Sequence, residues 1–330
     1  MGSTRSASRS FSPAKPSHPV RGYLFIAAAT FCWGISATMG RAVFTGRLLG
    51  DAPHAIDPLI IAQSRTTISL LIFAPILLLR RGGATLRISR RDFWLCLAIG
   101  ILGMAGSNFF YYLAIQRTNV ATAIILQYTA PIWVLLYMVV RGLQRATVRR
   151  VASVALAVVG SALAIGVVGG SGFKLDTLGV VAAQLAALAF GYYTVAGSDL
   201  LQRYDRWRIL LFAFLGAALF WQLVNPPWKI IAAHYTGGQW IFLIVFAITS
   251  VLLPFSLYFG GLGHLDATRA IVTSCLEPVF SIVIAAVALG EGVGPLQVAG
   301  IAIVLIATIV VQVPERVKAE RVPLVCEPIE

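Results

Sequence analysis

Charged residues are scarce in this sequence, and acidic residues are the scarcest. Of its 330 residues, 12% are charged and 58% are hydrophobic, with 13 Asp and Glu against 26 Lys and Arg. Soluble domains carry about 25% charged residues. This composition excludes an ordinary soluble domain and indicates that lipid is the solvent for most of the chain.

Cysteine is also rare, and its placement suits neither a disulfide framework nor a metal site. Cys32, Cys96 and Cys275 lie within or near apolar segments, and Cys326 is close to the C-terminus. The four histidines are scattered, without the spacing of a zinc hydrolase, and no glycine-rich phosphate loop is present. We therefore predict no catalytic residues, no metal and no cofactor, with the cysteines as small apolar fillers.

Apolar runs of about twenty residues recur ten times along the chain. A helix of roughly 20 apolar residues crosses the hydrocarbon core, whereas barrel strands are about ten residues long and alternate in polarity. The runs are continuous, so the sequence predicts an all-α integral membrane protein. The predicted spans are 20–41, 58–79, 93–115, 119–140, 151–168, 175–197, 208–224, 239–260, 267–288 and 295–313.

The placement of Lys and Arg predicts that both ends of the chain are cytoplasmic. Basic residues concentrate in cytoplasmic segments of membrane proteins. Nineteen of the 26 fall in 1–21, 80–91, 141–150, 203–208 and 316–321, and five fall in the segments between. These basic segments are expected to face anionic lipid headgroups, so the net charge of +13 does not require a nucleic-acid partner.

Both termini are predicted to be tails. Residues 1–19 are rich in Ser, Pro and Arg, which favours a disordered cytoplasmic tail and leaves an organellar transit peptide as the alternative. Residues 314–330 form a second cytoplasmic tail. Between them we expect one repeat at 20–168 and a second at 175–313.

An inverted repeat is indicated by two pieces of the chain that match at a constant shift of 147 residues, the difference between 131 and 278. The pieces lie five spans apart, and because five is odd, the second copy is upside down in the bilayer. Asn119 and Asp266 are expected to cap the following helices. Each proline removes one backbone donor, which frees the carbonyl four residues earlier. The matched pairs are Tyr111 and Tyr258, Asn119 and Asp266, and Pro131 and Pro278.

Several motifs give the chain a resemblance to a known family. They are Trp33-Gly34, Thr129-Ala-Pro131, Leu276-Glu277-Pro278-Val279-Phe280 and Leu289-Gly290-Glu291. The chain resembles the EamA-type ten-helix branch of the drug/metabolite transporter superfamily, and within it the aromatic amino-acid exporters. The first repeat lacks the Glu before its proline. The resemblance implies ten transmembrane helices in two inverted five-helix repeats around a central cavity.

Polar side chains at membrane depth are the candidate site. Secondary transporters built from inverted repeats bind substrate near the midplane, and amides with aromatic hydroxyls suit a polar or zwitterionic solute. The predicted substrate-binding residues are Trp33, Gln63, Asn108, Tyr111, Gln127, Gln184, Tyr192, Tyr258, Ser274 and Glu277, and the predicted hinges are Pro131 and Pro278.

Three ionisable residues within spans each allow two interpretations. Arg65 either extends to the headgroups or binds a carboxylate, and Arg269 likewise extends to headgroups or serves the site. Glu277 shares a helix face with Ser274 and Ser281. It is either a structural carboxyl between helices or a group that binds a proton or an amine.

The leading hypothesis is a secondary transporter in the bacterial cytoplasmic membrane that exports small amino acids, aromatic or neutral, by alternating access. The alternatives are an exporter of amines, multiple drugs or other metabolites, and an integral-membrane enzyme acting on lipids. The expected partners are a small-molecule substrate, the bilayer and, for coupling, the proton. We expect the protein to act as a monomer. The small-residue face of Ser153, Ala157 and Ser161 is expected to pack against another helix, either within the chain or between chains.

Overall fold

The computed structural model describes residues 18–44, 48, 56–166 and 176–313, and within these ranges it contains helices and no strand. The all-α prediction is confirmed. The predicted tails, 1–19 and 314–330, lie outside the described residues except for His18 and Pro19.

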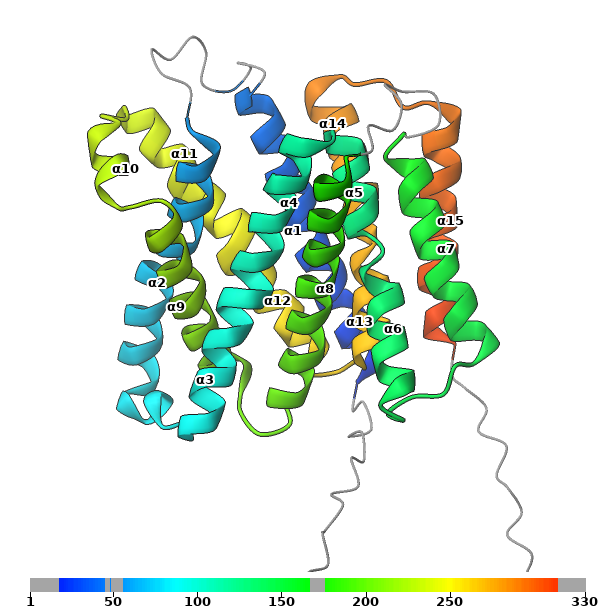
Figure 1. Ribbon diagram of the computed structural model, residues 1–330, viewed down its shortest axis with the longest axis horizontal. Coiled ribbons are helices and arrows are strands. Elements are labelled where there is room, and N and C mark those ends of the chain that lie inside the picture. The colour runs from blue at the N-terminus through cyan, green and yellow to red at the C-terminus, as the bar shows by residue number, and fades with distance from the viewer. Residues whose placement is uncertain (1–17, 45–47, 49–55, 167–175, 314–330) are drawn as a thin grey trace, which may run out of the picture.

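The helices follow the predicted spans closely (Figure 1). The first half contains α1 (Pro19–Phe44), α2 (Pro58–Arg81), α3 (Arg90–Ala98), η2 (Ile99–Ala105), α4 (Gly106–Arg117), α5 (Val120–Gln127), α6 (Ala130–Val140) and α7 (Val148–Ala164). The second half contains α8 (Thr177–Leu200), α9 (Arg206–Val224), α11 (Gly237–Ala247), η3 (Ile248–Leu252), α12 (Leu253–Leu262), α13 (Ala267–Ser274), α14 (Leu276–Leu289) and α15 (Pro295–Gln312). Two short helices, η1 (Gly83–Leu86) and α10 (Trp228–Ala232), lie in connections.

Nine of the predicted spans correspond, within the described ranges, to helical segments long and apolar enough to cross a membrane. The tenth, α7, has 17 described residues, which is at the lower limit of about 17 residues for a transmembrane helix. Its small-residue face is buried: Ser153, Ala157 and Ser161 are each 0% exposed. Because Gly160 of α7 approaches Val304 of α15, this face packs within the chain.

The fourth and ninth spans begin at the predicted caps and are interrupted at matched positions. Asn119 Oδ1 accepts a hydrogen bond from Thr122 N at 2.8 Å, and Asp266 Oδ1 accepts one from Arg269 N at 2.9 Å. The first half-helix of each span then ends, α5 at Gln127 and α13 at Ser274. These residues are the two whose carbonyls the prolines were predicted to free, so the interruptions have the same local cause.

Besides the caps and the interruptions, the two repeats share matched π-helical turns, which the sequence did not predict. The third and eighth spans each contain a π-helical turn, η2 (Ile99–Ala105) and η3 (Ile248–Leu252). At the shift of 147 residues, 99–105 corresponds to 246–252, a range that includes all of η3. Such turns widen the backbone and leave carbonyls for other partners.

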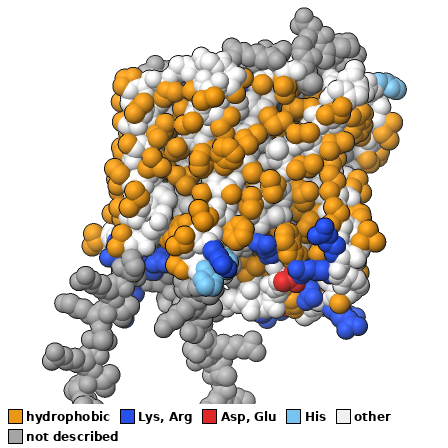
Figure 2. Space-filling view, turned by 180° about the vertical axis from the view of Figure 1, so that it is seen from behind, with side chains coloured by type: hydrophobic (Ala, Val, Ile, Leu, Met, Phe, Trp, Pro, Cys, Tyr) orange, Lys and Arg blue, Asp and Glu red, His pale blue; other side chains and the backbone are white. Residues whose placement is uncertain are grey.

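The two halves run in opposite directions in Figure 1. Helix α1 starts at the lower end of the bundle and rises, whereas α8 starts at the upper end and descends; α15 returns to the lower end. Figure 2 shows Lys and Arg gathered at this lower end, below a hydrophobic belt. We call it the basic end, formed by the connections 80–91, 141–150 and 203–208. The described ends of the chain therefore lie on the side where the basic residues concentrate.

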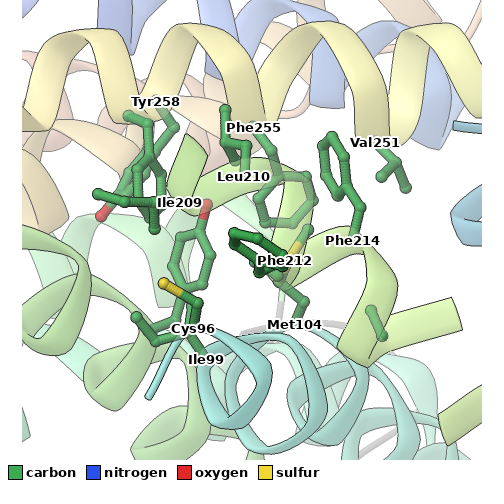
Figure 3. Close-up of a cluster of buried hydrophobic side chains, with 14 of the residues drawn as sticks. Cys96, Ile99, Met104, Ile209, Leu210, Phe212, Phe214, Val251, Phe255 and Tyr258 are labelled. Carbon is green, nitrogen blue, oxygen red and sulfur yellow. The ribbon is translucent and has the colours of Figure 1, made fainter. Parts of the chain in front are cut away.

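The largest buried cluster lies between η2, α8, α9 and α12 (Figure 3). It is rich in aromatic rings, and Phe212, Phe214, Phe255 and Tyr258 are among its members. Close approach of η2 and α9 needs glycine: a Cβ on Gly100 would lie 2.0 Å from the carbonyl oxygen of Ala213. Backbone atoms fix this contact, so no rotamer change relieves it.

We expect Gly100→Ala to destabilise the fold by about 1–3 kcal/mol or more, because the added methyl group overpacks a backbone-to-backbone contact. Gly40→Ala in α1 is the matched control, since nothing lies within 4 Å of its Cβ position and alanine favours a helix. Thermal unfolding of both variants in detergent checks this. Equal melting temperatures would contradict the packing argument.

Candidate functional site

A central cavity of about 630 Å³ lies between the halves. Its walls come from α1, α2, η2 and α4–α7 of the first half and from α8, α11, η3 and α12–α15 of the second half. Arg41 and Glu291 line it, so the cavity reaches the end of the bundle opposite the basic end. Their side chains form an ion pair at the mouth; exposed pairs of this kind contribute about 0–1 kcal/mol to stability.

Most of the predicted residues line this cavity. The structure brings together Trp33, Asn108, Tyr111, Gln127, Ser274 and Glu277, along with both prolines, Pro131 and Pro278. Gln63, Gln184, Tyr192 and Tyr258 are not among its lining residues. Each of these four has another place in the fold.

Gln63 belongs to a buried network between α2 and α9. It donates to Gln222 Oε1 at 2.8 Å and accepts from Asn225 Nδ2 at 2.7 Å, while Gln222 donates to Thr67 at 2.8 Å. Buried amides need such partners. In this structure Gln63 therefore joins two helices and does not face the cavity.

Gln184 supports the interruption between α5 and α6. Its Oε1 accepts from Trp133 Nε1 at 2.9 Å and from Thr129 Oγ1 at 3.2 Å. Its Nε2 donates to the carbonyl of Leu126, near the end of α5, at 3.4 Å. Gln184 therefore stabilises the interruption between α5 and α6, which lines the cavity, without lining the cavity itself.

Tyr258 lies next to the cavity's aromatic wall. It is 0% exposed, and its hydroxyl shares a 2.8 Å hydrogen bond with Thr194. Tyr192 packs partly buried against the main hydrophobic cluster. On the cavity side, Trp33 packs edge-on against Phe255 at 5.4 Å and Phe190 at 6.2 Å.

The first polar group in the cavity is Arg65 of α2. Its guanidinium donates to Asn108 Oδ1 of α4, and Asn108 Nδ2 donates to the carbonyl of Met104 at 2.7 Å. Arg65 Nε is buried and has no hydrogen-bond partner. Because Arg65 lines the cavity, it does not extend to the headgroups.

The second polar group is Glu277, at the start of α14. Its carboxylate accepts a hydrogen bond from the hydroxyl of Tyr128, which lies in the interruption between α5 and α6. The interruptions of the two matched spans are therefore joined side chain to side chain. Gln127 beside Tyr128 donates to Ser107 Oγ at 3.2 Å.

Trp33 connects the cavity to the π-helical turn of the second half. Its Nε1 donates to the carbonyl of Ser250 in η3 at 3.2 Å. Gly103 and Met104 of η2 also line the cavity. Both π-helical turns therefore lie at the cavity.

Arg65 and Tyr128 were not in the predicted binding set, and neither were the wall residues Phe190 and Phe255. The sequence marked Arg65 as a charged residue within a predicted span, but its neighbours in the sequence did not decide between a headgroup contact and a binding role. Tyr128 had a weaker signal, as the aromatic residue directly before the Thr-Ala-Pro turn. Arg269, the other ambiguous arginine, forms an ion pair with Asp266 at 3.3 Å and is absent from the lining.

Comparison with known proteins identifies the family to which this architecture belongs. A model of the EamA-like transporter family matches the chain twice, at residues 20–166 and 177–313. The chain belongs to the EamA-like transporter family. The double match agrees with the repeated breaks, caps and π-helical turns, and it confirms the family resemblance seen in the motifs.

Relatives support the same assignment. An uncharacterized transporter of Archaeoglobus fulgidus is 25% identical over 215 residues, which cover 64% of this chain and 75% of that protein. The uncharacterized transporter YcbK of Bacillus subtilis is 21% identical over 288 residues, covering 84% and 88%. A solved crystal structure superposes with a TM-score of 0.71 at 20% identity, covering 88% of this chain and 97% of the other, and so shares the fold. This EamA-family protein is thus a multi-pass membrane transporter with a small-molecule substrate.

Proposed function

We propose that this EamA-family transporter exports small amino acids, with aromatic or neutral side chains preferred, by alternating access. The proposal rests on one observation: a cation, Arg65, and a carboxylate, Glu277, line the same cavity, which also has aromatic walls. Arg65 suits the carboxylate of an amino acid and Glu277 suits its ammonium group. Trp33, Phe190 and Phe255 suit an apolar side chain.

The dimensions of the cavity agree with this proposal. Ligand sites usually enclose about 300–1,000 Å³, and this one encloses about 630 Å³. A phosphate carrier needs several Lys or Arg near the midplane. In the part of the chain that the structure describes, the lining has Arg65 at depth and Arg41 at the mouth.

An exporter of amines or of multiple drugs is the second candidate. Glu277 favours it, because a carboxylate alone is enough to bind an organic cation. In that case Arg65 would not contact the substrate, and Glu277 would serve as the proton-coupling group. Amines and amino acids that share the same side chain therefore separate the two candidates.

The proposed location is the bacterial cytoplasmic membrane, with the chain acting as a monomer of two repeats, 20–168 and 175–313, and both ends cytoplasmic. The gathering of Lys and Arg at the basic end supports this orientation. The cavity then reaches the outer end, and the buried rings around Tyr258 lie towards the cytoplasm.

Cysteine labelling from outside intact cells tests the orientation. Cys326 is first replaced by serine, since the other three cysteines are buried. We expect a membrane-impermeant maleimide to label Ala232→Cys and to leave Ala84→Cys unlabelled, because α10 and η1 lie at opposite ends of the bundle. Both positions are exposed. Labelling of both on the same side would contradict the topology.

Reconstitution tests the function itself. We expect purified protein in liposomes to release labelled phenylalanine or tryptophan chemically unchanged, faster than protein-free liposomes. Flux of phenethylamine without flux of phenylalanine would favour the amine exporter. Chemical modification of a lipid or solute without flux would favour the enzyme alternative.

A further inference from the structure

A second hollow lies on the surface at the basic end and is separate from the central cavity. It encloses about 840 Å³ between the start of α1, the α8–α9 connection and the end of α12. Arg21, Arg206 and His264 line it together with the apolar residues Leu24, Phe25 and Leu257. We call it the basic groove. The transport cycle proposed above uses none of these residues.

The guanidinium of Arg206 packs against aromatic rings in the groove. It lies 4.3 Å from the ring centroid of Trp207 and 5.5 Å from that of Phe25. A Cβ on Gly260 would lie 2.3 Å from its Nη1, so the guanidinium rests directly against the glycine backbone. Packing therefore fixes the position of this charge.

Among the described residues that line the groove, the one acid, Asp205, is already paired. Asp205 Oδ1 accepts from Arg81 Nη1 at 2.9 Å and from the backbone nitrogen of Trp207 at 3.1 Å. Within the described ranges, Arg21 and Arg206 have no ion-pair partner. Among the residues that the structure describes, the groove thus presents two positive charges that no carboxylate pairs with.

His264 reports the same positive potential. Its ring stacks on Phe25 at 6.3 Å, and its Nδ1 is buried without a hydrogen-bond partner. Burial, and then the nearby charges of His18, Arg21 and Arg206, lower the pKa of His264 below its usual value near 6.5. At neutral pH the imidazole is therefore uncharged, and the arginines supply the fixed charge of the groove.

The groove continues along α1 as an apolar surface. Leu24 is 65% exposed; it follows Arg21 by three residues and therefore shares its face of the helix. Ala28 extends the same face one turn further and also lines the hollow. In Figure 2, basic side chains of this end lie directly beneath the hydrophobic belt. A ligand here meets cations at one end and an apolar wall at the other.

We propose that the basic groove binds one anionic phospholipid, with its phosphate at Arg21 and Arg206 and an acyl chain along Leu24 and Ala28. Pockets lined by basic residues between transmembrane helices suit acidic headgroups. The apolar wall distinguishes a lipid from a free phosphate, which has nothing to place there. The lipid would join α1, α9 and α12, which belong to both halves.

Native mass spectrometry of the full-length protein in detergent tests the site. Phosphatidylglycerol and phosphatidylcholine with identical acyl chains are titrated separately. An arginine near an anionic surface contributes about fivefold, which is about 1 kcal/mol. With two arginines, we expect one phosphatidylglycerol to bind about 30-fold more tightly than phosphatidylcholine.

Paired variants test which residues cause the preference for phosphatidylglycerol over phosphatidylcholine. Arg21→Gln with Arg206→Gln should abolish it, whereas Arg87→Gln with Arg90→Gln, which removes two exposed charges from the same end, should retain it. Gly260→Ala, which displaces the Arg206 guanidinium, should weaken it, and Gly263→Ala should not, because its Cβ position has ordinary contacts of 3.6 Å or more. Melting temperatures identify any variant that fails to fold.

Three results would overturn the proposal. The first is equal binding of the two lipids to the wild type. The second is a preference that survives in the Arg21→Gln, Arg206→Gln variant. The third is displacement of phosphatidylglycerol by glycerol phosphate at a similar concentration, which would identify a site for soluble phosphate. Since these readouts involve no transport, they are independent of the identity of the substrate.

Discussion

Replacing Arg65 with glutamine is expected to weaken binding of phenylalanine about 100-fold and to leave binding of phenethylamine nearly unchanged. Truncating one partner of a buried charged pair costs about 2–5 kcal/mol. The guanidinium lies at the cavity wall with its Nε unpartnered, and only the amino acid has a carboxylate to pair with it. Isothermal titration of purified protein with the two ligands measures the difference.

Glu277→Gln is expected to give the complementary pattern. Binding of phenylalanine and of phenethylamine should weaken, while binding of phenylpropionate, which has no amine, should not. Because glutamine still accepts the hydrogen bond from Tyr128, the change removes the charge with little change of shape. Together the two variants assign one end of the substrate to each half of the protein.

Gln63→Ala is the matched control for both variants. Gln63 is an amide at similar depth on the same helix as Arg65, but it bonds Gln222 and Asn225 and does not line the cavity. We expect this variant to lose stability and to keep its affinity for phenylalanine. If Arg65→Gln weakened amine and amino acid equally, the assignment of Arg65 to the carboxylate would be wrong.

Pro131→Ala and Pro278→Ala are each expected to slow transport about tenfold, which corresponds to about 1.4 kcal/mol on the barrier, with little loss of affinity. We propose that the two prolines are matched hinges, each softening one interrupted span. Alanine restores the backbone donor for the carbonyls of Gln127 and Ser274 and so favours a continuous helix. A continuous helix opposes the movement of one half-helix against the other.

Pro75 supplies the control for this prediction. It lies inside α2, has no counterpart in the repeat and does not line the cavity, so Pro75→Ala should leave turnover unchanged. Binding affinity and initial transport rate are compared for the three variants in the same liposomes. Lost affinity at an unchanged turnover rate would mean that Pro131 and Pro278 only shape the cavity.

The features that the sequence predicted correctly are those fixed by local chemistry. The apolar runs set the helices, and Asn119 and Asp266 cap α5 and α13 because their side chains bond backbone groups three residues away. A missing donor at Pro131 acts on a carbonyl four residues earlier. Such effects stay within one or two helical turns, so they can be inferred without knowing the fold.

The tertiary structure alone decided which polar residues meet the cavity. Gln63 and Gln127 are both amides at membrane depth, yet one bonds α9 and the other lines the central cavity. Depth and polarity are properties of the sequence, but the direction a side chain faces depends on which helix packs beside it. The hydrogen bond between Tyr128 and Glu277 likewise requires two interrupted helices, distant in sequence, to meet. No local pattern specifies that meeting, because it arises from how the two inverted halves pack together.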